Sequence, residues 1–198
     1  MIKVGITGGI GSGKSTITNF FRLIGIPIYQ SDIRAKQLTQ TDTTIINGLK
    51  KIIAPDIYDA SGMLDRKRMA SIIFSNEELR QKVNALIHPA VRQDFRQWAA
   101  QCTQAPYVVC EAAIMIESGS YADMDKIILV NAPTQQRIER TMLRDKLSQQ
   151  QVINRIESQM PTEQLMPYAT YIVSTDDQHF ILPQLISIDT ELKKHATI

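Results

Sequence analysis

Gly8-Gly9-Ile10-Gly11-Ser12-Gly13-Lys14-Ser15 is the stretch of this 198-residue sequence that decides the predicted fold. It has the form G-x-x-x-x-G-K-S, the pattern of a phosphate-binding P-loop. An apolar run at residues 2–7 precedes it, and apolar residues at helical spacing follow it from Ser15 to Ile24. A strand, a glycine loop and a helix therefore follow one another in the order that a P-loop requires.

Each residue type in this stretch has a chemical use. Glycines permit backbone angles that other residues avoid, so several N–H groups can point at one phosphate. The helix N-terminus adds partial positive charge, Lys14 would lie near the β- and γ-phosphates, and the Ser15 hydroxyl can bind Mg²⁺. We therefore predict a nucleoside triphosphate site formed by Gly9, Gly11, Ser12, Gly13, Lys14, Ser15 and Thr16.

The composition argues against several other classes of protein. A formal net charge of only +2 gives no reason to expect bulk binding to nucleic acid or to a membrane surface. No apolar run approaches the length of a transmembrane helix, and the chain enters its first strand without a cleavable signal. Cys102 and Cys110 lack metal-ligand spacing and are typical of a reducing compartment. We expect a cytoplasmic protein with no obligatory protein partner.

Apolar runs further along the chain predict the other strands of one parallel sheet. They are Ile26–Tyr29, Tyr107–Cys110, Lys126–Val130 and Tyr171–Val173. Helical patterns separate and follow them, at Ile33–Leu38, Thr43–Ile53, Thr134–Arg144, Ser148–Gln159 and within His179–Lys194. Alternating strands and helices predict an α/β fold with its ligand site outside the carboxyl ends of the strands.

The region from about residue 56 to residue 99 departs from this alternation and is largely helical. Asp65 is a plausible cap for one helix, and Ser75-Asn76-Glu77-Glu78 is a capping box that opens a long helix running to about Cys102. Pro89 should kink or restart that long helix. We predict a helical subdomain inserted into the sheet protein.

Three acidic residues are candidates for chemistry. Asp32 lies just past the second strand, where a catalytic acid would sit, although Ser31 or Asp32 could instead only cap the next helix. Glu111 ends the third strand, where an acid suits Mg²⁺ or its bound water, although nearly any strand can end in an acid. Glu117 would lie nearer the acceptor than the nucleotide if the chain turns there; otherwise it is an exposed loop acid.

The helix after the fourth strand carries two arginines on one face, because Arg140 and Arg144 are four positions apart. Two guanidinium groups there can clamp phosphate oxygens or stabilise transition-state charge. The alternative is surface pairing with Glu139 or Asp145. Together with the polar helix that follows, this helix makes a natural lid at about residues 134–160.

The combined motifs resemble those of dephospho-CoA kinases. In the order of that family they are Thr7–Ser15, Ser31-Asp32-Ile33, Leu86-Ile87-His88-Pro89, Ile114-Met115-Ile116-Glu117, Gln136…Arg140…Arg144-Asp145 and Gln159. The resemblance implies a three-layer P-loop kinase fold with a five-stranded parallel sheet, a helical substrate-binding insertion and a lid. It also implies Mg²⁺-dependent transfer of the ATP γ-phosphoryl group to the ribose 3′-hydroxyl of dephospho-CoA, the last step of coenzyme A synthesis.

The resemblance assigns roles residue by residue. It implies a general base, a phosphate and Mg²⁺ pair, two lid arginines and two acceptor-side residues, which are Asp32, Lys14 with Ser15, Arg140 with Arg144, and His88 with Glu117. Many members have Asp-x-Asp at the second strand, whereas this chain has Gln30 first, which leaves Asp32 as the sole candidate base there. Two other readings stay open: a kinase for another nucleoside or nucleoside monophosphate, and a P-loop switch.

Overall fold

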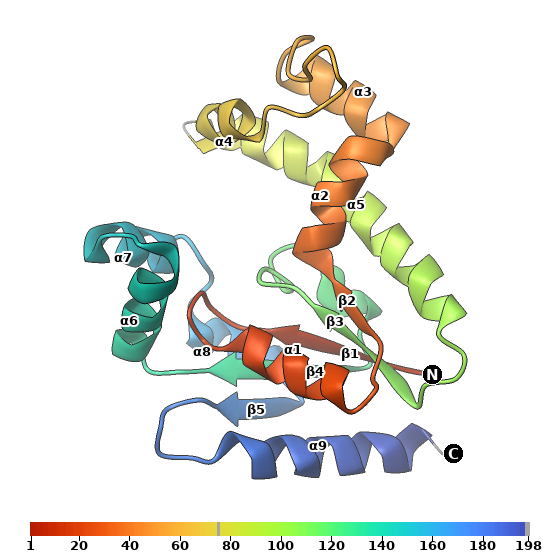
Figure 1. Ribbon diagram of the computed structural model, residues 1–198, viewed down its shortest axis with the longest axis vertical. Helices are drawn as coiled ribbons and strands as arrows, with labels where there is room; N and C mark the ends of the chain where they lie inside the picture. Colours follow the sequence, from red (N-terminus) through yellow and green to blue (C-terminus); the bar gives the residue numbers. More distant parts are fainter. Residues whose placement is uncertain (75, 197–198) are drawn as a thin grey trace. The chain divides into compact units, whose positions relative to one another are not determined.

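The computed structural model describes residues 1–74 and 76–196. The chain divides into two compact units, one formed by Met1–Gln30 with Trp98–Ile198 and the other by Ser31–Gln97. The first unit contains the parallel sheet and the P-loop, and the second is helical (Figure 1). In the described residues, no helix combines the length and the apolar character needed to cross a membrane.

The sheet is parallel throughout and has five strands in the order β2-β3-β1-β4-β5. The strands are β1 (Ile2–Thr7), β2 (Ile28–Gln30), β3 (Tyr107–Glu111), β4 (Lys126–Asn131) and β5 (Tyr171–Ser174). β1 lies at the centre, with Val4 paired to Val109 of β3 and Ile6 paired to Ile128 of β4. Such continuous apolar runs are expected in strands buried on both faces. The predicted α/β fold with a five-stranded parallel sheet is confirmed.

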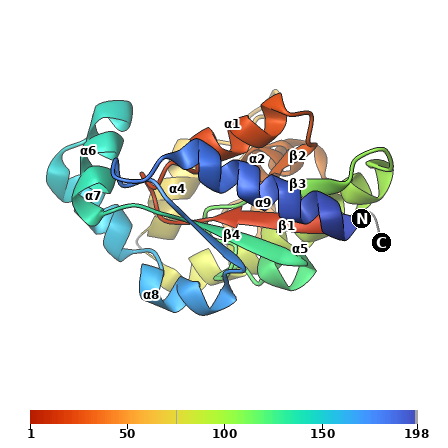
Figure 2. The same cartoon turned by 90° about the horizontal axis from the view of Figure 1, so that it is seen from below.

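Helices α1 (Lys14–Leu23) and α9 (Ile181–Ala196) lie side by side on one face of this sheet (Figure 2). Phe21 of α1 and Leu185 of α9 are buried in one apolar cluster with Val4 and Ile128 of the sheet. Full burial of one such side chain contributes about 1.5–3 kcal/mol to stability. This cluster therefore fixes α1, and with it the end of the P-loop, against the central strands.

The chain leaves β4 and forms two further helices in the first unit, α6 (Thr134–Asp145) and α7 (Gln149–Glu157), which contact each other. Lys146 ends α6 in a left-handed conformation, with φ of 54°. Ser148 then caps α7 in a reciprocal capping box with Gln151. The short helix α8 (Thr162–Leu165) and the 3₁₀ turn Met166–Tyr168 lead from there to β5, and another 3₁₀ turn, Ser120–Asp123, precedes β4.

The helical unit contains α2 (Ser31–Thr41), α3 (Thr43–Ile52), α4 (Arg66–Phe74) and most of α5 (Glu77–Gln101). Its core consists of Ile45, Leu49, Ile57, Tyr58, Leu64 and Val83. The Arg34 guanidinium donates to both carboxylate oxygens of Asp94, at 2.9 and 2.5 Å, and so ties α2 to α5. Asp42 caps α3 by accepting hydrogen bonds from two backbone N–H groups.

The helix boundaries differ from the predicted ones at the start of this unit. α2 begins at Ser31, directly after β2, and not at Ile33. Ser31 and Asp32 therefore belong to the first turn of α2, and the predicted start at Ile33 is too late. β2 itself starts at Ile28 rather than Ile26, because Pro27 has no N–H for a strand ladder.

Two predictions about the long helix concern its start and the effect of Pro89. The predicted capping box starts at Ser75, which lies outside the described residues; Asn76 caps α5, and its Oδ1 accepts from Leu79 N at 3.0 Å. Pro89 lies inside α5, which does not restart there. Val91 and Phe95, buried on the far side of Pro89, hold the helix in place by packing. The predicted cap of α4 is confirmed, since Asp65 accepts from Arg68 N at 2.9 Å.

Candidate active site

The P-loop joins the end of β1 to the start of α1 at the carboxyl edge of the sheet. Gly11 and Gly13 have φ of 75° and 94°, in the left-handed region that glycine alone enters without strain. Gly13 is the residue before α1, so its conformation turns the chain into the helix. The first N–H groups of a helix generally lack a carbonyl partner within the helix and can bind an anion; here Thr16 N donates to the Gly13 carbonyl at 3.0 Å.

Lys14 lies across this loop. Its Nζ donates to the carbonyl oxygens of Gly8 and Gly9, at 2.8 and 3.2 Å. Ser15 and Thr16 are exposed beside it. The arrangement places one full positive charge and two hydroxyl groups at the N-terminus of α1, where the helix dipole also favours negative charge.

A cavity of about 260 Å³ opens at this point of the first unit. Its lining comes from the P-loop, from the end of β3 and from α6, and consists of Gly11, Gly13, Lys14, Ser15, Thr16, Glu111, Arg140 and Arg144. Residues far apart in the sequence are thus brought together at one site: the predicted metal residues, both predicted lid arginines and the predicted phosphate residues other than Gly9 and Ser12. Cations and helix N–H groups predominate, which suits a polyanionic ligand.

Glu111 is the acidic group of this cavity. It faces Gln30 of the neighbouring strand, whose Nε2 donates to Glu111 Oε2 at 3.4 Å. Gln30 in turn accepts from Arg22 at 3.3 Å. An amide at position 30 therefore stabilises the Glu111 carboxylate, whereas an acid there would repel it.

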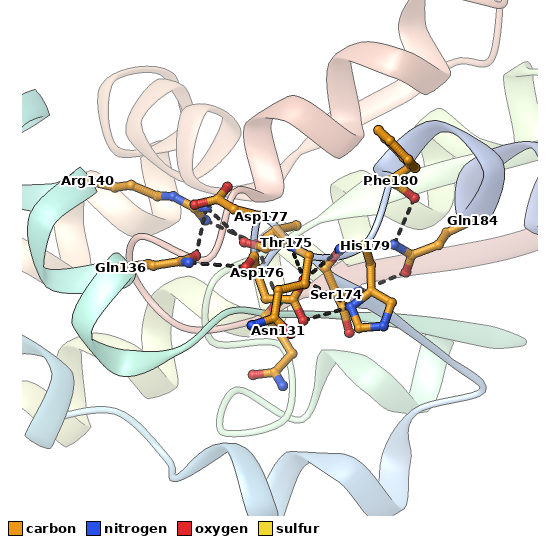
Figure 3. Close-up of polar contacts among 11 residues, drawn as sticks. Asn131, Gln136, Arg140, Ser174, Thr175, Asp176, Asp177, His179, Phe180 and Gln184 are labelled. Atoms are coloured by element: carbon orange, nitrogen blue, oxygen red, sulfur yellow. Dashed lines mark hydrogen bonds and ion pairs between the residues drawn. The ribbon is translucent and has the colours of Figure 1, made fainter.

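Arg140 is held at the cavity by the turn that follows β5 (Figure 3). Its guanidinium donates to the Thr175 carbonyl at 2.8 Å, to Thr175 Oγ1 at 3.1 Å and to Gln136 Oε1 at 3.0 Å. It also pairs with Asp177 at 3.2 Å. Arg144 instead forms the surface pair with Asp145 that the sequence left open, at 2.7 and 3.0 Å.

The same turn is fixed against the P-loop. Thr175 is 3% exposed, and its Oγ1 donates to the Ser12 carbonyl at 2.8 Å. Asp176 accepts from the backbone and the ring of His179, and the His179 hydrogen bond holds the pKa of Asp176 below its usual value. Thr175 was not among the predicted site residues. Its position directly after the last strand, at the edge of the sheet where ligands bind, could have indicated a role in the site.

Two further P-loop contacts also went unpredicted. Arg137 of α6 is 7% exposed, and its Nε donates to the Ile10 carbonyl at 3.0 Å. Gln159, just after α7, accepts from Ile10 N at 2.8 Å. The sequence holds no signal for the Arg137 contact, because its partner is a backbone atom more than a hundred positions away.

Residues 2–180 match the sequence model of the dephospho-CoA kinase family. The chain belongs to that family. The dephospho-CoA kinase of Porphyromonas gingivalis is 39% identical over 189 residues, which cover 95% of this chain and 93% of the relative. That of Bacteroides fragilis strain YCH46 is 35% identical over 187 residues, covering 94% and 91%. The family predicted from the motifs is therefore confirmed.

Solved structures agree with this family's fold. A crystal structure of a Thermus thermophilus protein superposes with a TM-score of 0.81 at 30% identity, covering 98% of this chain and 97% of the other. The dephospho-CoA kinase from Campylobacter jejuni gives 0.72 at 23% identity, with 98% of each chain covered. A shikimate kinase from Acinetobacter baumannii gives 0.55 at 15% identity, covering 98% and 94%, and shares the fold.

The remaining candidates of this dephospho-CoA kinase family member are Glu117, Asp32 and His88. Glu117 is exposed in the first unit, and its Oε1 accepts from Met160 N at 3.3 Å, just beyond α7. Asp32 and His88 belong to the helical unit. Asp32 is exposed in the first turn of α2, and His88 is half-buried in α5, where burial lowers its pKa. Among the described residues of the first unit, the lining of the cavity does not include Glu117.

Proposed function

We propose that this protein transfers the γ-phosphoryl group of ATP to the ribose 3′-hydroxyl of dephospho-CoA, giving CoA and ADP. This is the last step of coenzyme A biosynthesis. The observation that carries the proposal is the cavity that unites Lys14, Glu111, Arg140 and Arg144 in a chain whose family match spans residues 2–180. Reduced thiols at Cys102 and Cys110 are compatible with the cytoplasmic location that we propose.

The nucleotide side of the proposed reaction rests on positioning and charge. Gly9, Gly11, Ser12, Gly13 and Thr16 form the loop and helix start that surround the phosphates. Lys14 then releases the carbonyls of Gly8 and Gly9 and binds β- and γ-phosphate oxygens, where it offsets the charge that develops on transfer. Arg140 and Arg144 bind the transferring group from α6.

The donor set of the cavity fits Mg²⁺. Glu111 supplies a carboxylate and Ser15 a hydroxyl, and both are the oxygen ligands that this ion prefers. Within residues 1–74 and 76–196 there is no cluster of three or more His, Cys, Asp or Glu side chains that could hold a metal. That pattern suits an ion bound by one or two protein groups plus substrate phosphates. When bound, Mg²⁺ would neutralise charge on the β- and γ-phosphate oxygens.

The acceptor side of the proposal uses Asp32 as the general base. The 3′-oxygen of the acceptor forms a bond to the γ-phosphorus as the bond from that phosphorus to the ADP oxygen breaks. The hydroxyl proton passes to the Asp32 carboxylate. Phosphoryl transfer depends mostly on orientation, so an ordinary ionised carboxylate suffices. His88 and Glu117 are assigned to acceptor binding because they fall in the acceptor-side motifs of the family.

We further propose the domain roles that the sequence suggested. The helical insertion, at about residues 56–99, takes the acceptor, and residues 134–160 close as a lid over the nucleotide. Closure of this kind excludes water from a reacting phosphoryl group. Arg140 contacts Thr175 and Asp177. On closure of the lid, its guanidinium leaves these groups and binds phosphate.

The test is ADP formation by the purified protein with ATP and Mg²⁺, comparing dephospho-CoA, adenosine, AMP and no acceptor. Strong stimulation by dephospho-CoA alone, with CoA as the product, is the expected result. A response to AMP or adenosine instead would contradict the proposed acceptor but not the proposed phosphoryl-transfer site. ADP formation that no acceptor stimulates would favour the P-loop switch and overturn the proposal.

A further inference from the structure

Ile10, in the middle of the P-loop, is bound through both of its backbone polar groups by the chain segment that contains α6 and α7. Its N–H donates to Gln159 Oε1 at 2.8 Å, and its carbonyl accepts from Arg137 Nε at 3.0 Å. The two partners lie at opposite ends of this segment, one in the first turn of α6 and the other just beyond α7. These two groups belong to the successive peptide units on either side of the Ile10 Cα, so both ends of the segment fix the backbone at Ile10.

The fit around Arg137 is close. Its guanidinium lies against Gly9 so tightly that a Cβ on Gly9 would collide with it. A Cβ on Gly11 would collide with the Arg137 carbonyl and lie 2.7 Å from Thr141 Oγ1. Gly9 and Gly11 thus both leave room for α6, and at Gly11 the obstacle is a backbone carbonyl and the φ is positive.

Arg137 keeps its positive charge although its side chain is buried beside the loop. Burial lowers the pKa of its guanidinium, and the carboxylate of Glu163 acts in the opposite direction. Arginine nevertheless stays protonated in proteins. Arg137 is absent from the described lining of the phosphate cavity, and it lines a separate recess with Glu163 and Asp176. Arg137 therefore affects a bound phosphate indirectly, by positioning the loop and by the electrostatic field of its positive charge.

We propose that Arg137 and Gln159 are positioning residues that hold the backbone on both sides of the Ile10 Cα, and so preset the P-loop in its phosphate-binding form. The proposal rests on the proposed function only in taking ATP as the nucleotide. With the Ile10 carbonyl turned to Arg137 and its N–H turned to Gln159, the loop presents the N–H groups of later residues to the phosphates. Loss of either hydrogen bond leaves the backbone at Ile10 less constrained, so that ATP binding must then also order the loop.

The substitution Arg137→Met removes the donor and the charge while keeping a long side chain, and Gln159→Leu removes the acceptor. Gln159→Glu keeps an acceptor oxygen and serves as the conservative rescue. Arg155→Met is the matched control, because Arg155 belongs to α7 and forms a 3.4 Å ion pair with Asp145, which is not a P-loop residue. Each full-length variant is checked for folding by its thermal unfolding midpoint.

The primary readout is the Kd of Mg–ATP measured by calorimetry without acceptor, which does not depend on which acceptor the enzyme uses. We expect Arg137→Met to weaken ATP binding about tenfold or more, as loss of one charge-assisted hydrogen bond would. Gln159→Leu should weaken it several-fold, Gln159→Glu should restore most of that loss relative to Gln159→Leu, and Arg155→Met should leave it within twofold. In turnover, KM for ATP should rise while KM for the acceptor stays within twofold.

The double variant Arg137→Met/Gln159→Leu tests whether the two residues act together on the backbone at Ile10. The combined loss of ATP affinity should be smaller than the product of the single losses, since either one alone already frees Ile10. Unchanged ATP affinity in a folded Arg137→Met protein would overturn the proposal, as would an equal rise in both KM values. If Arg137→Met does not fold, Gln159→Leu against Gln159→Glu decides: equal ATP affinities in those two would overturn it. Failure of dephospho-CoA as acceptor would leave these binding results intact.

Discussion

Gly11→Ala is the substitution that most directly probes how the P-loop packs against α6. Gly11 has φ of 75°, and a Cβ there would collide with the Arg137 carbonyl and approach Thr141 Oγ1 to 2.7 Å. Gly25→Ala is a matched control in the same unit, because Gly25 has φ of 84° and a Cβ there meets nothing within 4 Å among the described residues. Both variants place alanine in a left-handed backbone conformation, and only Gly11→Ala also places a Cβ against α6.

The expected costs can be worked separately. The left-handed conformation costs an L-residue about 1–2 kcal/mol, and alanine recovers about 0.4–1 kcal/mol through the unfolded chain. Gly25→Ala should therefore lower the free energy of unfolding by about 1 kcal/mol. Overpacking adds about 1–3 kcal/mol, so Gly11→Ala should lower it by about 2–4 kcal/mol, because its nearest neighbour is a backbone carbonyl that cannot rotate away.

Urea unfolding at equilibrium measures both free energies, and calorimetry measures ATP binding to the same proteins. We expect Gly11→Ala to be the less stable variant and to bind ATP more weakly, while Gly25→Ala binds ATP as the unsubstituted protein does. Equal free energies of unfolding for the two variants would refute the described packing of α6 on the loop.

Three further predictions concern catalysis, metal and pH. Asp32→Asn should reduce kcat by about 10²-fold or more, the usual size of a general-base contribution, with ATP affinity unchanged; near-normal kcat would remove Asp32 as the base. Glu111→Gln should raise the Mg²⁺ concentration needed for half-maximal rate, and excess EDTA should abolish turnover; an unaltered Mg²⁺ requirement in that variant would exclude Glu111 from metal binding. Burial lowers the pKa of His88 below its ordinary 6.5, so the unfolded chain binds the proton more readily. The part of the free energy of unfolding that depends on neutral, buried His88 is therefore fully present above about pH 6.5 and is lost as the pH falls below it. In His88→Gln, urea midpoints between pH 5 and pH 7 (about the range of that titration) should fall less steeply on acidification, and an identical slope would count against the shift.

The local parts of the fold could be predicted because their signals are local. The P-loop is encoded by glycines at fixed spacing before a helical pattern, and β3 by a continuous apolar run. The predicted phosphate and metal residues, Lys14 and Glu111 among them, then meet in one cavity because parallel strands end at the same edge. Family motifs supplied the acceptor, which no residue pattern specifies by itself.

The rest depended on contacts between distant segments, which periodicity does not encode. Nothing in the sequence places β1 between β3 and β4, or sets Thr175 on the Ser12 carbonyl. A proline in a helical pattern signals a break, but packing on both sides keeps α5 continuous through Pro89. Arg137 looks like any surface arginine until α6 is packed against the loop.

The position that is phosphorylated tests the central claim most directly. The protein is incubated with Mg–ATP and either dephospho-CoA or its analogue lacking the ribose 3′-hydroxyl, and the products are identified by mass and phosphorus NMR. We predict CoA bearing a 3′-phosphate from the first acceptor and no phosphorylated product from the second. A phosphorylated product from the 3′-deoxy analogue, or ADP formed equally with both and no CoA, would contradict the account.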